Sequence, residues 1–140
     1  MEKRVVITGL GAISPIGNNI KDLWEGIKTG KCGIDEITAF DTTTFKTKLA
    51  AEVKEYDPLK YFDTKQAKRL DRFSQFAIIA AREAFKDSGI TEENTDFERV
   101  GIYVRSGIGG FDTIQNQCRK KKKKGNGRVS PMFIPMGICN

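Results

Sequence analysis

The chain has 140 residues, and 39% of them are hydrophobic, so its length and composition fit about one domain with a core of its own. Its net charge is 24 − 18 = +6, and the six basic residues at positions 119–124 supply all of that excess, so the rest of the chain is neutral. The chain contains no histidine, which excludes Ser-His and Cys-His nucleophile pairs within it and removes the commonest metal ligand.

The amino-terminal sequence and the cysteines predict a cytoplasmic protein. The opening residues MEKR lead into a short apolar run at residues 5–7, which does not match a signal peptide, and no apolar stretch reaches the length of a membrane span. Cys32, Cys118 and Cys139 are an odd number of cysteines without metal-type spacing. We therefore expect structural free thiols, no metal site and no membrane partner.

The stretch at residues 4–18 predicts the start of an α/β unit. Residues 5–7 are β-branched, which is typical of a strand buried on both faces in a sheet covered by helices. Gly9 and Gly11 then turn the chain at little steric cost. A strand that continues through a glycine-rich loop into a helix is how such a unit begins.

Downstream, the apolar spacing predicts a helix over residues 20–29, which Asn19 caps and Gly30 ends. A loop is expected at residues 32–44, and a short strand is expected near residues 49–53. Asp57 and Pro58 then favour the start of a short helical piece.

The second half of the chain predicts helices around one more strand. The longest helix signal covers residues 63–89, and a β-branched strand follows at residues 100–104. A helix is predicted over residues 111–124, and a last apolar segment covers residues 132–139. Two strands joined by a long helical crossover favour neighbouring parallel strands. The sequence therefore predicts a parallel-strand core with covering helices.

Two features suggest ligand sites but also have plain structural interpretations. Residues 9–14 approximate a dinucleotide fingerprint, but Ser14 replaces its third glycine, and the acidic residues near the expected distance, Asp35 and Glu36, lie in a predicted loop. We therefore favour a tight strand-to-helix turn over nucleotide binding. The basic run at residues 119–124 contains no aromatic residue to stack a base, so we favour a solvated surface there over a nucleic-acid site.

A third feature is a set of cations that share one face of the predicted helix over residues 63–89, at the spacing i, i+3 and i+4: Lys65, Lys68 and Arg69. Such a face is often only solvated, but its charge would suit docking of an acidic partner.

Taken in order, the motifs of the chain resemble the amino-terminal part of β-ketoacyl-acyl-carrier-protein synthases, in particular the elongating type II enzymes. The resemblance runs along the whole chain without a large gap, and the agreement of several motifs in order makes it specific. It rests on residues 4–11, residues 14–17, Trp24, Gly30, Gly33, Ile34, Phe40, Asp41, residues 68–73, residues 87–89, residues 106–110, Ser130, Pro131, Phe133, Pro135 and Asn140.

The resemblance implies an α/β, thiolase-like fold, of which residues 1–140 would be an incomplete amino-terminal half that stops before the nucleophile. The family catalyses a decarboxylating Claisen condensation in fatty acid biosynthesis. A cysteine takes the acyl group from its carrier, and two histidines assist decarboxylation of malonyl-carrier protein and attack on the acyl thioester. We therefore expect no catalytic residue in this chain and no activity from the chain alone.

The resemblance also assigns roles to single residues. Two of them match residues that line the acyl pocket, namely Ile108 and Phe133. Four cations match the basic patch that receives the acidic acyl carrier protein: Lys65, Lys68, Arg69 and, by a looser match, Arg128. The substrates would be carried on the phosphopantetheine of that protein, so no cofactor of the chain itself is implied. The full-length family forms homodimers.

Two features depart from the family pattern, namely Arg105 and the homogeneous lysines at positions 120–124. Arg105 stands where the family has a small residue at the end of a buried strand, and an arginine there must find a partner or reach water. The alternative interpretation of the chain is a non-enzymatic basic module that binds acyl carrier protein or nucleic acid. Of these two partners we expect the carrier protein and not nucleic acid.

Overall fold

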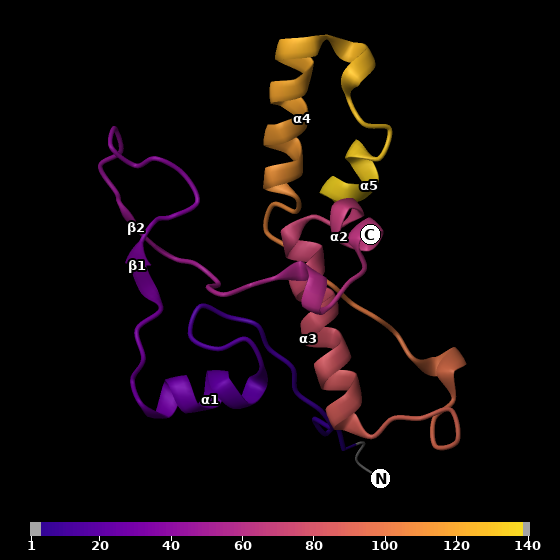
Figure 1. Cartoon of the computed structure of the whole chain (residues 1–140). Coiled ribbons are helices and arrows are strands. Elements are labelled where there is room, and N and C mark those ends of the chain that lie inside the picture. Colours follow the sequence, from indigo (N-terminus) through magenta and orange to yellow (C-terminus); the bar gives the residue numbers. More distant parts are fainter. Residues whose placement is uncertain (1–3, 139–140) are drawn as a thin grey trace. The chain divides into compact units, whose positions relative to one another are not determined.

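The computed structural model describes residues 4–138, so Cys139 and Asn140, which the predictions above include, lie outside the described residues. Helices make up most of the regular secondary structure of the described chain (Figure 1). It divides into two units, one with residues 4–56 and 79–91 and the other with residues 57–78 and 92–138. The α-helices, strands and short 3-10 helices (η) are α1 (Ile20–Lys28), β1 (Ile34–Glu36), β2 (Leu49–Ala51), η1 (Pro58–Lys60), α2 (Thr64–Arg69), α3 (Arg72–Ser88), η2 (Phe97–Arg99), α4 (Phe111–Lys124), η3 (Asn126–Arg128) and α5 (Phe133–Gly137).

In the first unit, Gly9 and Gly11 lie directly against the backbone of α3. A Cβ atom on Gly9 would stand 2.2 Å from the carbonyl oxygen of Ala84, and one on Gly11 would stand 2.0 Å from that of Ala80. Both distances are far below any real contact of a Cβ atom, so only glycine allows the chain to approach the helix this closely. This packing role supports the interpretation of the glycines as part of a tight turn.

Two carboxylates of α3 hold the irregular segment that precedes α1. Glu83 accepts hydrogen bonds from the N–H groups of Ala12 and Ile20, both at 2.9 Å. Asp87 accepts another from the N–H group of Leu10 at 2.9 Å. Bonds to ionised acceptors are stronger than bonds between neutral groups, so these carboxylates fix a segment that has almost no secondary structure of its own.

α1 confirms the helix predicted over residues 20–29. The side chain of Asn19 accepts a hydrogen bond from the N–H group of Asp22 at 2.8 Å, as an N-cap residue does. Gly30 follows the last turn with a φ of +66°, a left-handed conformation that glycine adopts freely at helix ends.

β1 and β2 form a short antiparallel ladder in which Ile34 is paired with Ala51. The strand predicted near residues 49–53 is confirmed, whereas the loop predicted at residues 32–44 is wrong where β1 forms. The sequence around β1 has no apolar alternation of its own, and the strand exists because β2 offers a partner. Pairing of this kind depends on context more than on local propensity.

In the second unit, the single helix predicted over residues 63–89 is wrong at residues 70–71, where the chain breaks into α2 and α3. Leu70 ends α2 with extended backbone angles, φ −105° and ψ 129°. The side chain of Gln75, on α3, donates hydrogen bonds to the carbonyl oxygens of Ala67 at 2.9 Å and Leu70 at 3.0 Å. It thereby satisfies acceptors that the end of α2 leaves unpaired.

α4 confirms the helix predicted over residues 111–124, and Gly125 ends it with a φ of +79°. The chain then returns through η3 to α5, and both elements pack against α4 (Figure 1). The N–H group of Ser130 donates to the side-chain oxygen of Gln117 at 2.9 Å. This bond ties the returning segment to the middle of α4.

The two segments predicted as buried strands, residues 5–7 and 100–104, are neither strands nor buried. Val5 and Tyr103 are each 94% exposed. Within residues 4–138 the sheet consists of the antiparallel pair β1 and β2, so these residues do not form the predicted parallel-strand core. A β-branched run becomes a buried strand only where neighbouring strands pair with its backbone, and the described residues supply none for these two segments.

Candidate functional site

α2 carries the three cations predicted to receive a carrier protein, and all of them are exposed: Lys65, Lys68 and Arg69. Asp63 fixes the start of this helix, because its carboxylate accepts hydrogen bonds from the N–H groups of Lys65 and Gln66, both at 2.8 Å. The spacing i, i+3 and i+4 then sets the cations on one face. Among the described residues no ion pair joins them to an acidic side chain, so their charge is directed to solvent.

Buried polar side chains lock this cationic helix to the rest of its unit. Gln75 and Asp71 are only 6% and 7% exposed, and Gln75 holds the end of α2 as described above. Oδ2 of Asp71 accepts hydrogen bonds from the N–H group of Thr113, at 3.0 Å, and from its hydroxyl. Thr113 lies in the first turn of α4, whose N-cap residue, Gly110, has no side chain to offer. Asp71 therefore supplies the missing cap from the break between α2 and α3.

The glycine loop before α4 presents Ile108 to solvent from a fixed backbone. Gly109 has a φ of +78°, which glycine tolerates and other residues rarely adopt. The N–H group of Gly110 donates to the carbonyl oxygen of Gly137 in α5 at 2.8 Å. A Cβ atom on Gly110 would lie 2.7 Å from Oδ2 of Asp71, so the loop has no room for a larger residue. Ile108 itself is 72% exposed.

The two predicted pocket residues, Ile108 and Phe133, lie on segments that contact each other. The hydrogen bond from Gly110 to Gly137 joins the glycine loop, which carries Ile108, to α5, which carries Phe133. Phe133 begins α5 and is half-buried. Arg128 lies elsewhere, in η3, after the carboxyl end of α4. Asp71 holds the other end of this 14-residue helix, and at about 1.5 Å per residue the two ends are about 20 Å apart. Arg128 is therefore separated from the cations of α2.

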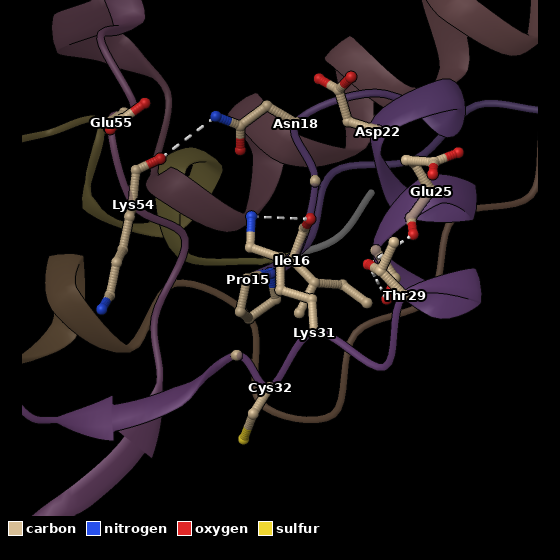
Figure 2. Close-up of a pocket in the computed structure, with 13 residues that line it drawn as sticks. Pro15, Ile16, Asn18, Asp22, Glu25, Thr29, Lys31, Cys32, Lys54 and Glu55 are labelled. Atoms are coloured by element: carbon tan, nitrogen blue, oxygen red, sulfur yellow. Dashed lines mark hydrogen bonds between the residues drawn. The ribbon is translucent and has the colours of Figure 1, made fainter.

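The first unit also contains an open cavity of about 450 Å³ that no sequence motif indicates (Figure 2). Residues 15–18, α1 with Thr29, residues 31–33 and residues 54–55 line it. The side-chain amide of Asn18 donates to the carbonyl oxygen of Lys54 at 3.2 Å, and Nζ of Lys31 donates to that of Ile16 at 3.3 Å. Because distant loops enclose the cavity, no local pattern marks it, and none of the predicted site residues lines it.

The wall of this cavity carries charges of both signs, from Asp22, Glu25, Lys31, Lys54 and Glu55. Lys54 also forms an ion pair with Asp35. The hydrogen bond from Lys54, with a further bond from the N–H group of Glu36, lowers the pKa of Asp35, and the same ion pair raises the pKa of Lys54. Both groups are held in their charged forms, and the mixed wall selects neither anions nor cations.

Within residues 4–138, no group of cysteine and carboxylate side chains is arranged to hold a metal ion, and no helix is long and apolar enough to cross a membrane.

Comparison with known proteins connects these features to a family. The model of the beta-ketoacyl synthase N-terminal domain matches residues 2–140. A 3-oxoacyl-[acyl-carrier-protein] synthase 2 of Staphylococcus aureus is 47% identical over 136 residues, which are 97% of this chain and 33% of the relative. The protein of the same name from Coxiella burnetii is 45% identical over 141 residues, which cover 100% of this chain and 34% of the relative. The chain thus spans about a third of the length of these relatives.

Solved structures agree with this match. The ishigamide ketosynthase/chain length factor superposes with a TM-score of 0.80 at 28% identity, over 99% of this chain and 34% of that one. The structure of a type II PKS acyl-carrier protein in complex with its ketosynthase bound to the hexaketide superposes with a TM-score of 0.77 at 27% identity. The match covers 99% of this chain and 37% of that one. The fold is that of the amino-terminal part of a thiolase-like ketosynthase. The chain belongs to the β-ketoacyl synthase family, whose N-terminal domain it matches along nearly its whole length.

Proposed function

We propose that this chain is the carrier-docking and acyl-contacting part of a fatty-acid-elongating 3-oxoacyl-[acyl-carrier-protein] synthase. The complete enzyme would condense an acyl thioester with malonyl-carrier protein and release carbon dioxide. The observation that carries the proposal is the identity of 47% and 45% to two relatives with that name. Because the chain spans a third of those relatives, condensation is proposed for the whole protein, and docking and acyl contact for these residues.

The docking role is proposed for α2. Its three cations are exposed and have no acidic partner within residues 4–138, and a surface of this kind accelerates and orients the encounter with an acidic protein. The ketosynthase of one similar structure is in complex with an acyl-carrier protein, which supports the same class of partner here. Arg128 would belong to a second contact, because α4 separates it from α2.

The acyl contact is proposed for Ile108 and Phe133. Ile108 is held on a loop fixed through Gly110, and its exposed side chain would gain free energy by covering an acyl chain, at about 25 cal/mol per Å² of apolar surface removed from water. The acyl group would arrive on the phosphopantetheine of the carrier, so the chain needs no cofactor of its own. Dimerisation and a cytoplasmic location are proposed with the family role.

A charge-reversal experiment on the 140-residue chain tests the docking role. The variant Lys65→Glu, Lys68→Glu, Arg69→Glu is compared with Lys120→Glu, Lys122→Glu, Lys124→Glu, which changes the net charge by the same amount. Binding of fluorescently labelled acyl carrier protein is followed by anisotropy at low salt. We expect the α2 variant to weaken binding by about tenfold or more and the α4 variant to change it by about twofold or less. Equal losses, a larger loss in the α4 variant, or no carrier binding by the unmodified chain would overturn the assignment.

A further inference from the structure

The cationic end of α4, residues 119–124, is a strongly charged surface that none of the roles above uses. Its members are consecutive and exposed, namely Arg119 and the five lysines at positions 120–124. They account for the whole net charge of +6, so the positive potential of an otherwise neutral chain is concentrated on the last turns of one helix.

Among residues 4–138, the elements that pack against this surface carry no acidic side chain. The sequence has no acidic residue after Asp112, so η3 and α5, the elements that pack against α4, offer none. Within the described residues none of the six side chains forms an ion pair. Like charges at i, i+3 and i, i+4 destabilise a helix, and the negative end of the helix dipole compensates part of this destabilisation. A bound polyanion would remove the repulsion.

The arrangement of the cations indicates the shape of that polyanion. One face of the cationic end carries Asn116, Arg119, Lys120, Lys123 and Lys124, whose side chains border a shallow, open hollow. Lys121 and Lys122 lie on other sides of the helix, because successive residues are rotated by about 100°. Six consecutive cations therefore surround the whole helix, so a flexible chain of negative charges can follow them, whereas a flat protein surface can face only one side.

We infer that the cationic end of α4 binds the phosphate backbone of a single-stranded nucleic acid. The three cations of α2 share one face, which a folded protein can meet, whereas the six consecutive cations at residues 119–124 surround their helix. Phosphate contacts require charge alone. Because the cationic end has no aromatic side chain to stack a base, this binding is independent of base sequence and strongly dependent on salt. The inference differs from the sequence-based expectation because the structure shows all six cations exposed on the last turns of α4, with no ion pair among the described residues.

The test uses the 140-residue chain and a fluorescently labelled oligothymidine, with anisotropy titrations over a series of salt concentrations. If all six cations meet phosphates, the logarithm of the binding constant should fall with that of the salt concentration at a slope of about −4. The variant Lys120→Gln, Lys123→Gln, Lys124→Gln should reduce the slope by about 2, because each phosphate contact contributes about 0.7. Glutamine has nearly the helix propensity of lysine, and circular dichroism verifies that the helix content is kept.

The matched control is Lys65→Gln, Lys68→Gln, Arg69→Gln, which has the same net charge and should leave the slope unchanged. An equal reduction in both variants would show attraction by net charge alone and would overturn the inference, as would the absence of salt-dependent binding. Displacement of the oligothymidine by poly-glutamate at equal charge concentration would overturn it in favour of an acidic protein partner. The inference does not depend on the proposed synthase role, because α2 takes no part in it.

Discussion

At the scale of single residues, the geometry of the second unit depends on Asp71. Its position between α2 and α3 lets one carboxylate oxygen receive both the N–H group and the hydroxyl of Thr113. The carboxylate therefore faces the positive end of the α4 dipole, where a negative charge is most favourable. Gly110 leaves the space that this contact needs. A buried polar group that is fully satisfied in this way fixes one arrangement of its neighbours.

We predict that Asp71→Ala opens the first turn of α4. The substitution leaves the buried N–H group of Thr113 without an acceptor, which costs about 1–3 kcal/mol. Hydrogen exchange by NMR measures this as a loss of protection at the amides of Thr113 and Ile114. The control Asp112→Ala removes an exposed carboxylate from the same turn and should cost less than about 1 kcal/mol. Equal protection in Asp71→Ala and the unmodified chain would refute the capping role.

At the scale of elements, the sequence was sufficient to predict those helices whose capping residues and apolar positions lie close together in the chain. α1 has its cap and its terminal glycine within a few residues of its apolar positions, and α4 ends at Lys124, the predicted boundary, where Gly125 follows. The break between α2 and α3 escaped prediction because it depends on the side chain of Gln75, which bonds the end of α2 from the following helix. The helical periodicity of the sequence continues through the break and hides it.

For strands and sites too, features set by local sequence could be predicted, and features that depend on distant segments could not. The cations of α2 were predictable as a group because helical spacing alone sets them on one face. The conformation of residues 5–7 and 100–104 was not predictable from their own sequence, because a strand also requires pairing partners, which the described residues do not provide. The cavity of the first unit could not be predicted either, because four segments that are separate in the sequence line it. The separation of Arg128 from α2 follows from the length of α4, which a match by motif does not convey.

At the scale of the whole chain, we predict that residues 1–140 alone do not catalyse condensation. They contain no histidine, so neither decarboxylation nor attack has the assistance that the family uses, and the exposed thiols of Cys32 and Cys118 have no imidazole to activate them. The measurement is mass spectrometry of the carrier-bound products after incubation with acyl- and malonyl-carrier protein. A 3-oxoacyl product above the level of a protein-free control would contradict the prediction.

The same chain exposes much of the apolar surface that would normally stabilise a fold, and we predict a broad thermal transition with binding of a hydrophobic dye. Phe62 and Ile79 are the buried hydrophobic side chains among residues 4–138, whereas Val5 and Ile7 are 94% and 82% exposed. Full burial of one such side chain is worth about 1.5–3 kcal/mol, and this gain is missing at every exposed position.

Two variants make this prediction specific. Val5→Thr, Ile7→Thr should lower dye fluorescence and concentration-dependent association without lowering the transition temperature, because these side chains are almost wholly exposed. Ile79→Thr should instead lower the transition temperature, because it places a hydroxyl at a position that is only 7% exposed. Calorimetry and sedimentation velocity measure both effects. A sharp, cooperative transition in a monomeric sample that binds no dye would mean that these apolar side chains are covered in solution.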